Sequence, residues 1–200
     1  MKQLVRSSAL AARDTLCTQV KQQKSQAICK QLEALLDASF FQFPSESQLT
    51  VAVYAAMPSE VDLTSFVRHA YMRGVRVVFP CMNRAEERAS RMVMRAVSKI
   101  DFERGDVPFV CSPIEAFEPD EALLAGFPIV KPFDIDMAVV PLVAYDNQNR
   151  RLGYGGGNYD GFLSRLRPRA VVVGAAFTEQ RVDEVPCEAH DLPLPHIVTA

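Results

Sequence analysis

Five of the nine glycines in this 200-residue chain lie within residues 151–161, RLGYGGGNYDG. An ordered glycine costs roughly 0.5–1 kcal/mol relative to alanine in regular structure, so this concentration indicates a loop whose backbone must stay unobstructed. Adjacent glycines let backbone N–H groups converge on one anion. The stretch lies between an apolar run and a helical pattern, which is where ligands bind in open α/β sheets. Two interpretations stay open here: a phosphate-binding loop, or a tight turn that needs positive φ angles.

Two charged residues bracket the glycines. Arg151 can bind a phosphate with two parallel hydrogen bonds, or it can be a solvated loop residue beside Arg150. Asp160 falls in the first turn of the following helix, where a carboxylate can cap the helix or bind Mg²⁺. No Gly-Lys-Ser/Thr follows, so the stretch is not a Walker A motif, and it lacks the early position of a Rossmann fingerprint. The pattern favours phosphate chemistry without specifying the ligand.

The bulk composition excludes several classes of protein. The net charge is −2 with both signs mixed, which is not the electrostatic footprint of a nucleic-acid-binding protein. The longest apolar runs, such as residues 137–145, are too short to span a bilayer. The first residues have no apolar core of a secretory signal and read as an amphipathic helix. We therefore expect a cytoplasmic monomer that acts on small molecules, with no nucleic acid or membrane as partner.

The cysteines do not suggest a metal site. They are odd in number and widely spaced, and no C-x-x-C or Cys/His cluster is present, which argues against zinc. We expect reduced thiols that mostly fill the core, with the last of them more exposed. The five are Cys17, Cys29, Cys81, Cys111 and Cys187.

The first half of the chain predicts two helices followed by a βαβ unit. Helices are expected over 2–16 and 18–38, the second with one apolar stripe of Val20, Ala27, Ile28, Leu32, Leu35 and Leu36. Residues 49–55 form a β-rich run, 61–74 a helix that ends at Gly74, and 75–80 a second strand stopped by Pro80. A strand, a helix and a strand within about 30 residues favour a parallel sheet.

The second half adds further strands. Residues 81–130 are rich in proline and irregular, with one candidate strand in RMVMRAV. A buried strand over 137–145, the glycine stretch, a helix over 158–166, a central strand over 170–177 and a short final strand follow. The predicted fold is α/β: a single three-layer domain, residues 1–200, with a mainly parallel central sheet flanked by helices.

Several segments, taken in order, resemble one family. RLGYGGGNYDGFL resembles the R-x-G-x-G-x-G-x-Y-D signature of the 5-formyltetrahydrofolate cyclo-ligases. Four further segments are similar to that family's N-terminal Lys/Arg pattern, its strand with a following glutamate, its strand before the glycines, and its closing segment. These are KQLVR, YAAMPSEVDL, MAVVPLVAYDNQNRRLGYG and VVGAAFTEQRVDEVPCEAHDLPLPHIVTA. The resemblance covers almost the whole chain, and residues 81–125 match least.

The resemblance implies an ATP- and Mg²⁺-dependent ring closure. ATP phosphorylates the formyl oxygen of 5-formyltetrahydrofolate, the substrate's N10 attacks the activated carbon, and 5,10-methenyltetrahydrofolate, ADP and phosphate result. The implied catalytic residues are Arg151 and Asp160, and the implied metal ligands are Asp160 and Asp191. The residues implied for ATP are Lys2, Arg6, Arg151, Gly153, Gly155, Gly156, Gly157 and Tyr159, and those for folate are Met57, Glu60, Tyr154 and Asn158.

Two departures from the family pattern keep alternatives open. Asn158 stands where many relatives have an aromatic residue, and Gly161 where they have a basic one. Arg165, one helical turn on, is a candidate to restore that charge. Arg13 matches the family pattern less specifically, and both a functional role and a solvated helix charge stay open for it. The alternatives are a non-catalytic homologue that binds reduced folate or a nucleotide, and a sugar-phosphate isomerase-like enzyme that uses the loop for a substrate phosphate.

Overall fold

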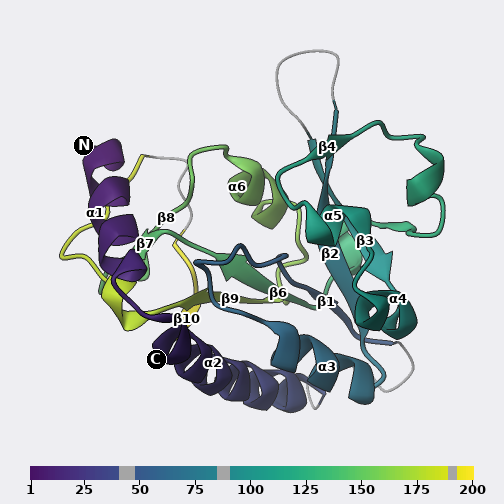
Figure 1. Ribbon diagram of the computed structural model, residues 1–200, viewed down its shortest axis with the longest axis horizontal. Helices are drawn as coiled ribbons and strands as arrows, with labels where there is room; N and C mark the ends of the chain where they lie inside the picture. The colour runs from purple at the N-terminus through teal and green to yellow at the C-terminus, as the bar shows by residue number, and fades with distance from the viewer. Residues whose placement is uncertain (41–47, 85–90, 189–192) are drawn as a thin grey trace.

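The centre of the fold is a mainly parallel β-sheet (Figure 1). The computed structural model describes residues 1–40, 48–84, 91–188 and 193–200. Within these residues eight strands form the sheet in the order β10-β9-β6-β1-β2-β3-β5, with β4 paired to β2. Strands β10 through β2 run parallel, whereas β3 is antiparallel to both β2 and β5. The strands are β1 Thr50–Ala52, β2 Arg76–Asn83, β3 Arg91–Val97, β4 Ala116–Phe117, β5 Ile129–Val130, β6 Met137–Pro141, β9 Val171–Ala176 and β10 His196–Thr199.

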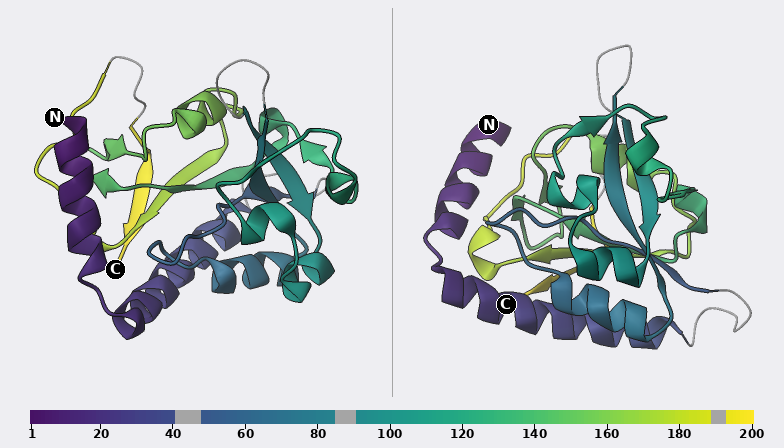
Figure 2. Two further views of the ribbon diagram at one scale, coloured as in Figure 1. Left: turned by 45° about the horizontal axis from the view of Figure 1, so that its top comes forward. Right: turned by 45° about the vertical axis from the view of Figure 1, so that its right-hand side comes forward.

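Helices cover both faces of the sheet, which gives the three layers (Figures 1 and 2). Because successive side chains of a strand point to opposite faces, Val51 and Val53 pack with α2 and α3, whereas Ala52 between them packs with Phe162 of α6. The helices are α1 Lys2–Asp14, α2 Thr18–Ser39, α3 Thr64–Met72, α4 Lys99–Arg104, α5 Pro108–Cys111 and α6 Asn158–Leu163, with 3₁₀ turns η1 Ala122–Leu124, η2 Pro132–Asp134 and η3 Thr178–Gln180.

A small hairpin leads into the glycine-rich stretch. Strands β7 (Ala144–Tyr145) and β8 (Arg151–Leu152) pair antiparallel, so the expected single strand over 137–145 is in fact split into β6 and β7. At the break, the buried Gln180 side chain donates to the carbonyls of Leu142 (2.6 Å) and Val143 (3.1 Å). The split lets the chain leave the sheet and return with Arg151 beside it.

Helix α1 does not pack beside α2 and α3. Figure 1 shows it (purple) beside the β7–β8 hairpin, and it also contacts η3. Its Ala9 packs with Val143, Ala144 and Leu152 in a small apolar cluster. The N-terminal helix is thereby held against the hairpin that carries the glycine-rich stretch.

Several details of the predicted elements were wrong. Strand β2 continues through Pro80 to Asn83, because Pro80 lies beyond the residues of β1 that pair with β2, where a missing N–H is tolerated. The apolar stripe of α2 excludes the exposed Ala27 and includes Cys29. Helix α6 ends at Leu163 rather than at residue 166. Three cysteines (Cys17, Cys111 and Cys187) are exposed, and only Cys29 and Cys81 lie in the core.

Among the helices in the parts of the chain that the structure describes, none combines the length and apolarity needed to cross a bilayer.

Candidate functional site

A cavity of about 550 Å³ lies where β1 and β6 end, at the carboxyl edge of the sheet. This is the edge at which open α/β sheets bind ligands, and the volume is typical of a small-molecule site. All the residues expected at the site, with the exception of Asp191, line this cavity. They are Lys2, Arg6, Met57, Glu60, Arg151, Gly153, Tyr154, Gly155, Gly156, Gly157, Asn158, Tyr159 and Asp160. Asp191 and its neighbour His190 lie outside the described residues.

The glycine loop, residues 153–157, forms one wall of the cavity and needs glycine at two positions for different reasons. Gly155 has φ +104°, and a Cβ added there would lie 3.3 Å from a guanidinium nitrogen of Arg6. Gly157 has φ +66° and forms the N-cap of α6. Side-chain-bearing residues rarely adopt such φ angles, so the loop conformation depends on these glycines. The backbone is left open toward the cavity, as a phosphate-binding loop requires.

Helix α1 supplies two cations to the same wall. The Nε of Arg6 donates to the carbonyl of Gly153 at 2.8 Å. The ammonium group of Lys2 lies 3.2 Å from a carboxylate oxygen of Glu188, which also lines the cavity. Lys2 and Arg6 are one helical turn apart and so project from the same side of α1. Together with Arg151, they make this side of the cavity cationic.

Arg151 and Asp160 are bonded directly to each other. The guanidinium of Arg151 donates to the carboxylate of Asp160, and the Arg151 side chain is only 5% exposed. The Nε of Arg151 is buried without a hydrogen-bond partner among the described residues. The two residues were expected to bracket the loop with separate charges, but they form an ion pair. Asp160 orients Arg151 and offsets its positive charge.

Glu60 forms a polar part of the cavity lining beside Tyr154. One carboxylate oxygen accepts from the backbone N–H of Met57 at 2.9 Å, and the other accepts from the Tyr154 hydroxyl at 3.0 Å. Burial raises the pKa of Glu60, and the hydrogen bonds from Met57 and Tyr154 together with the charge of Arg13 oppose that rise. The carboxylate is held in place with lone pairs remaining for donor groups of a ligand.

Two tyrosines beside Glu60 stay protonated. Tyr54 is 4% exposed and donates its hydroxyl proton to the carbonyl of Val61 at 3.0 Å. Burial raises the pKa of Tyr54 well above its ordinary value, and burial likewise raises the pKa of Tyr159. Both phenols are therefore neutral near pH 7, which excludes them as bases and leaves them as walls of the cavity.

The apolar side of the cavity comes mainly from a region where the sequence pattern was least informative. Met82, Met92, Pro113 and Ile114 line it together with the predicted Met57. Ile114 is 83% exposed, so it lies at the mouth. Methionine side chains are flexible and adapt their shape to a ligand. The occurrence of methionines at the ends of two neighbouring strands is the feature of the sequence that could have indicated this apolar side.

Arg13, whose role the sequence left open, is hydrogen-bonded to two hydroxyl groups. Its Nη1 donates to the Tyr154 hydroxyl at 3.0 Å and its Nη2 to Ser59 Oγ at 2.6 Å. In contrast, Arg165 donates to the carbonyl of Gly161 and does not line the cavity, so it does not restore the charge that Gly161 lacks. The amide of Asn158 lies within 3.2 Å of the Cβ position of Gly156, over the glycine loop.

The carboxylates of the cavity fit one of the ways in which proteins bind Mg²⁺. The described residues contain no group of three or more His, Cys, Asp or Glu side chains placed to hold a metal. Mg²⁺, however, is usually bound by one or two carboxylates, with substrate phosphates and water completing its octahedron. The Asp160 side chain is 27% exposed on the cationic side and has a second oxygen not engaged by Arg151, so it fits that mode of binding.

Comparison with known proteins assigns the family. The model of the 5-formyltetrahydrofolate cyclo-ligase family matches residues 1–200. The chain is 28% identical over 160 residues to 5-formyltetrahydrofolate cyclo-ligase of Escherichia coli K12, covering 75% of this chain and 77% of that one. It is 25% identical over 183 residues to the enzyme of Mycoplasma pneumoniae, covering 91% and 88%.

Solved structures agree with the fold. A 5,10-methenyltetrahydrofolate synthetase from Mycoplasma pneumoniae superposes with a TM-score of 0.70 at 23% identity, covering 98% of this chain and 96% of that one. The synthetase of Aquifex aeolicus superposes with a TM-score of 0.69 at 26% identity, covering 99% and 89%. The mixed α/β fold with its mainly parallel sheet is therefore confirmed, and the chain is an enzyme that belongs to the 5-formyltetrahydrofolate cyclo-ligase family.

Proposed function

We propose that the protein converts 5-formyltetrahydrofolate to 5,10-methenyltetrahydrofolate with consumption of ATP and release of ADP and phosphate. The observation that carries this proposal is the division of one cavity into two unlike sides. Cations and the glycine loop line the phosphate side, whereas Glu60 and apolar side chains line the other. A nucleoside triphosphate is complementary to the first side, and a folate is complementary to the second. The reaction requires the two ligands to be in contact.

The phosphate side would hold and polarise the triphosphate. Phosphoryl transfer demands positioning and charge stabilisation more than covalent chemistry from the protein. Lys2 and Arg6 reach this side from α1, and the Asp160-bound guanidinium of Arg151 adds a fixed donor. Backbone N–H groups of residues 153–157 are accessible because glycine leaves them uncovered. Tyr159 also lines the cavity.

The folate side would orient the pterin. Glu60 accepts hydrogen bonds from the N–H donors on the pterin's polar edge, as its engaged but unsaturated oxygens permit. Met57, Tyr154 and Asn158 contribute to the surrounding surface, and the methionines of the apolar side pack against the ring. This places the formyl oxygen toward the phosphate side.

Ring closure itself needs no protein nucleophile. Phosphorylation turns the formyl oxygen into a good leaving group, and the attacking N10 belongs to the same molecule. Well-oriented intramolecular attack reaches effective molarities of roughly 10⁵–10⁸ M. The protein's contribution is to hold the substrate folded so that N10 faces the activated carbon. A magnesium ion held at Asp160, when bound, would neutralise charge on the ATP phosphates.

Other properties remain part of the proposal. We propose that residues 1–200 function as one domain, in the cytoplasm and as a monomer, with no nucleic acid or membrane as partner and with Asp191 as the second magnesium ligand. Of the two alternative functions, the sugar-phosphate isomerase has nothing in the cavity to favour it, since the family match points to folate chemistry. The non-catalytic binding protein is separated from the enzyme by one assay.

The decisive experiment follows the absorbance of the methenyl product. The protein is mixed with 5-formyltetrahydrofolate, ATP and Mg²⁺, and parallel samples omit ATP or Mg²⁺. We expect product only in the complete mixture, with one ADP formed for each methenyl group. Calorimetric binding of folate without turnover would instead support the non-catalytic alternative. Product formed without ATP would overturn the phosphorylation step.

A further inference from the structure

The face of α1 that carries Arg6 also carries Arg13, two helical turns later. Residues seven apart lie on one face of a helix. Both arginines reach the glycine-rich stretch: Arg6 donates to the Gly153 carbonyl, and Arg13 donates to the hydroxyl of Tyr154. The first contact holds the backbone of the loop, and the second holds the side chain of the next residue. Helix α1 therefore fixes the glycine loop at two points.

Arg13 is buried to an extent that a solvated helix charge would not be. The residue is 4% exposed, and its Nε has no hydrogen-bond partner among the residues that the structure describes, the Asp14 carboxylate lying 3.6 Å away. Both of its hydrogen bonds go to hydroxyls, those of Tyr154 and Ser59. Among the described residues no carboxylate accepts a hydrogen bond from this buried charge, so its desolvation is not offset by a direct charged hydrogen bond.

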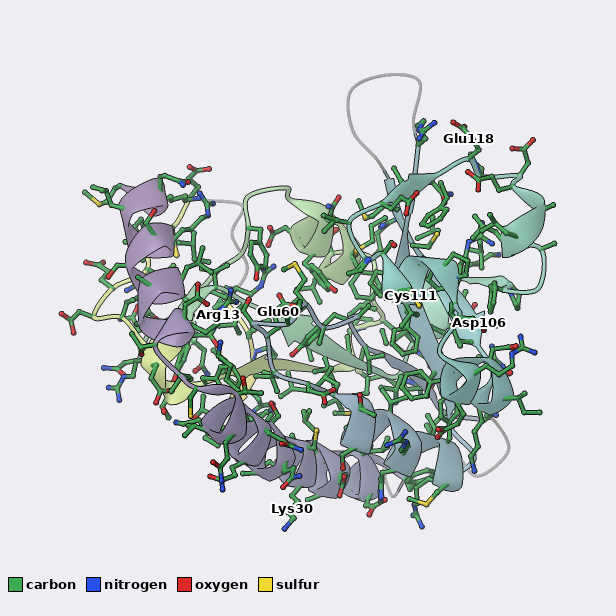
Figure 3. The ribbon with its side chains drawn as sticks, in the orientation of Figure 1. Arg13, Lys30, Glu60, Asp106, Cys111 and Glu118 are labelled. Carbon is green, nitrogen blue, oxygen red and sulfur yellow. The ribbon has the colours of Figure 1, made fainter. Side chains whose placement is uncertain are left out.

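The two hydroxyls connect Arg13 to Glu60. Tyr154 accepts a hydrogen bond from Arg13 and donates its own proton to a Glu60 oxygen at 3.0 Å. Ser59 immediately precedes Glu60 in the turn that Met57 closes. Figure 3 shows Arg13 and Glu60 close together between α1 and the sheet, consistent with their electrostatic interaction. The guanidinium is thus linked to the Glu60 carboxylate through the Tyr154 hydroxyl, and to the backbone beside Glu60 through Ser59.

We infer that Arg13 is a positioning residue for folate: through Tyr154 and Ser59 it holds the Glu60 carboxylate in the orientation that accepts the polar edge of the pterin. The inference rests on the proposed function, because it assigns the folate side of the cavity to Glu60. It makes a specific demand on kinetics. Loss of Arg13 weakens folate binding, whereas ATP, which lies against the other wall, keeps its affinity.

Arg13 also affects when Glu60 is ionised. The titratable groups that face Glu60 are Arg13 from α1, Tyr154 from the glycine loop, Tyr159 from α6 and Tyr54 from the end of β1. Arg13 is the cation of this set, and the three phenols are neutral near pH 7. Removing the cation raises the pKa of Glu60 further, so the loss of folate affinity in acid should begin at a higher pH.

The test compares Arg13→Gln, Arg13→Lys and Tyr154→Phe with two matched controls outside the cavity, Arg68→Gln and Tyr71→Phe. For each variant we would measure kcat, KM for both substrates, the pH dependence of the folate KM, and the calorimetric Kd for 5-formyltetrahydrofolate without nucleotide. In Arg13→Gln we expect the KM and Kd for folate to rise about tenfold or more, which is the size of one lost hydrogen bond to a charged network. The KM for ATP should stay within about threefold.

Two conservative variants distinguish positioning from structure. Arg13→Lys retains the charge. It should recover part of the folate affinity and restore the wild-type dependence of the folate KM on pH in acid. Tyr154→Phe, which removes one hydroxyl from a half-exposed ring, should weaken folate binding in the same direction without unfolding the protein. The controls should change none of these values.

Failure of this inference is distinguishable from failure of the proposed function. If the folate KM and its dependence on pH in acid were both unchanged in Arg13→Gln, the positioning role would be overturned. A general loss, in which both KM values rise, the thermal midpoint falls and Arg13→Lys rescues nothing, would also overturn it. If the wild-type protein bound folate but made no product, the proposed catalysis would fail while the calorimetric comparison still decided the role of Arg13. Absence of folate binding by the wild-type protein would overturn both.

Discussion

What a charged side chain in this cavity can bind depends on the residue to which it is already hydrogen-bonded. Arg151 would be a full cation for phosphate, yet its buried guanidinium is bonded to Asp160. Asp160 would be a free magnesium ligand, yet one of its oxygens is occupied by Arg151. Each residue therefore modifies what the other can do, and replacing one changes both.

Asp160→Asn separates the two roles of the carboxylate. The change keeps the shape and removes the negative charge, and we expect kcat to fall about 10²-fold or more, as for other preorganised charges at a transition state. If Asp160 holds magnesium, the Mg²⁺ concentration for half-maximal activity should also rise. Titration of activity with Mg²⁺ at fixed ATP measures this. An unchanged Mg²⁺ requirement with a raised ATP KM would show that Asp160 acts only by orienting Arg151.

Glu60 predicts how folate recognition depends on pH. Burial raises its pKa, so protonation in the folded protein begins above the ordinary glutamate value of about 4.3. The protonated acid cannot accept two N–H donors as the carboxylate does, and the folate KM should rise as pH falls. Steady-state kinetics from about pH 8 to pH 5, with enzyme-free samples subtracted, test this. In Glu60→Gln the KM should be high and flat across the range.

The stability linked to Glu60 changes with pH in the opposite direction to the predicted loss of folate affinity. A carboxyl whose pKa is raised in the folded state binds its proton more tightly there than in the unfolded chain. This group alone therefore favours the folded state as pH falls. If circular dichroism showed unfolding that paralleled the rise in KM, the assignment of that rise to Glu60 would have to be abandoned.

At the scale of elements, the glycine loop is shaped by the hairpin before it and the helix after it. Gly155 has the left-handed backbone and the close Arg6 contact, whereas Gly161 has neither and no atom within 4 Å of an added Cβ. Gly155→Ala should cost about 1 kcal/mol of unfolding free energy and raise the KM for ATP. Gly161→Ala, inside α6, should be neutral or stabilise by up to about 1 kcal/mol. Equal effects on the ATP KM would contradict this account.

The hairpin itself depends on one buried carboxylate. Asp146 is 1% exposed and accepts hydrogen bonds from the backbone of Gln148, Arg150 and Val185 and from the Arg150 side chain. Burial alone would raise the pKa of Asp146, but these hydrogen bonds outweigh burial and lower it. The turn that leads to Arg151 is thereby tied to the segment that precedes Glu188.

Asp146→Asn should destabilise the protein by about 2–4 kcal/mol, because it leaves buried donors without a charged acceptor. The lowered pKa means that the stability contributed by Asp146 is present above the unfolded value of about 3.9 and is lost as pH falls through the folded pKa. Urea unfolding of wild type and variant measures the difference, which should shrink in acid. Asp183→Asn, at an exposed position nearby, serves as the control and should change stability by less than about 0.5 kcal/mol.

Sequence patterns predicted the elements better than their pairing. Short apolar runs and helical spacing are local signals, and they located both long helices, the βαβ unit and the strands of the parallel core. The antiparallel arrangement of β3 and β5 and the break after Pro141 depend on distant partners, among them Gln180. Cysteine placement failed for a related reason: Cys17 is the N-cap of α2 and Cys111 ends α5, so these thiols lie outside the apolar stripes.

The candidate site was predictable to the extent that its residues share a motif. The glycine loop, Arg151 and Asp160 are contiguous, and the resemblance added Lys2, Arg6 and Glu60; the structure places all of these around one cavity, while their individual roles remain predictions. The role of Arg13 stayed open because its partners, Ser59 and Tyr154, are 46 and 141 residues away. A buried arginine on a helix has no local signature that distinguishes it from an exposed one.

For the whole molecule, the cavity joins the N-terminal helix to the second half of the chain. A ligand that bridges these parts should stabilise the entire fold. A non-hydrolysable ATP analogue at about 100 times its Kd contributes about 2.7 kcal/mol, which corresponds to a rise in Tm of roughly 5–10 °C for a chain of this size. Differential scanning fluorimetry measures the shift. Arg6→Gln should abolish most of it, and an equal shift in that variant would argue against nucleotide binding beside α1.

The hydrogen bonds between α1 and the glycine-rich stretch span 147 and 141 residues. During synthesis, therefore, Arg6 and Arg13 emerge from the ribosome long before their partners exist. A nascent chain can form α2, α3 and β1 with β2 early. The cavity forms last, when the β7–β8 hairpin and the glycine loop are synthesised and pack against α1. Truncated chains that end before residue 151 should be unable to retain either substrate, which makes ligand affinity a direct report on completed synthesis and folding.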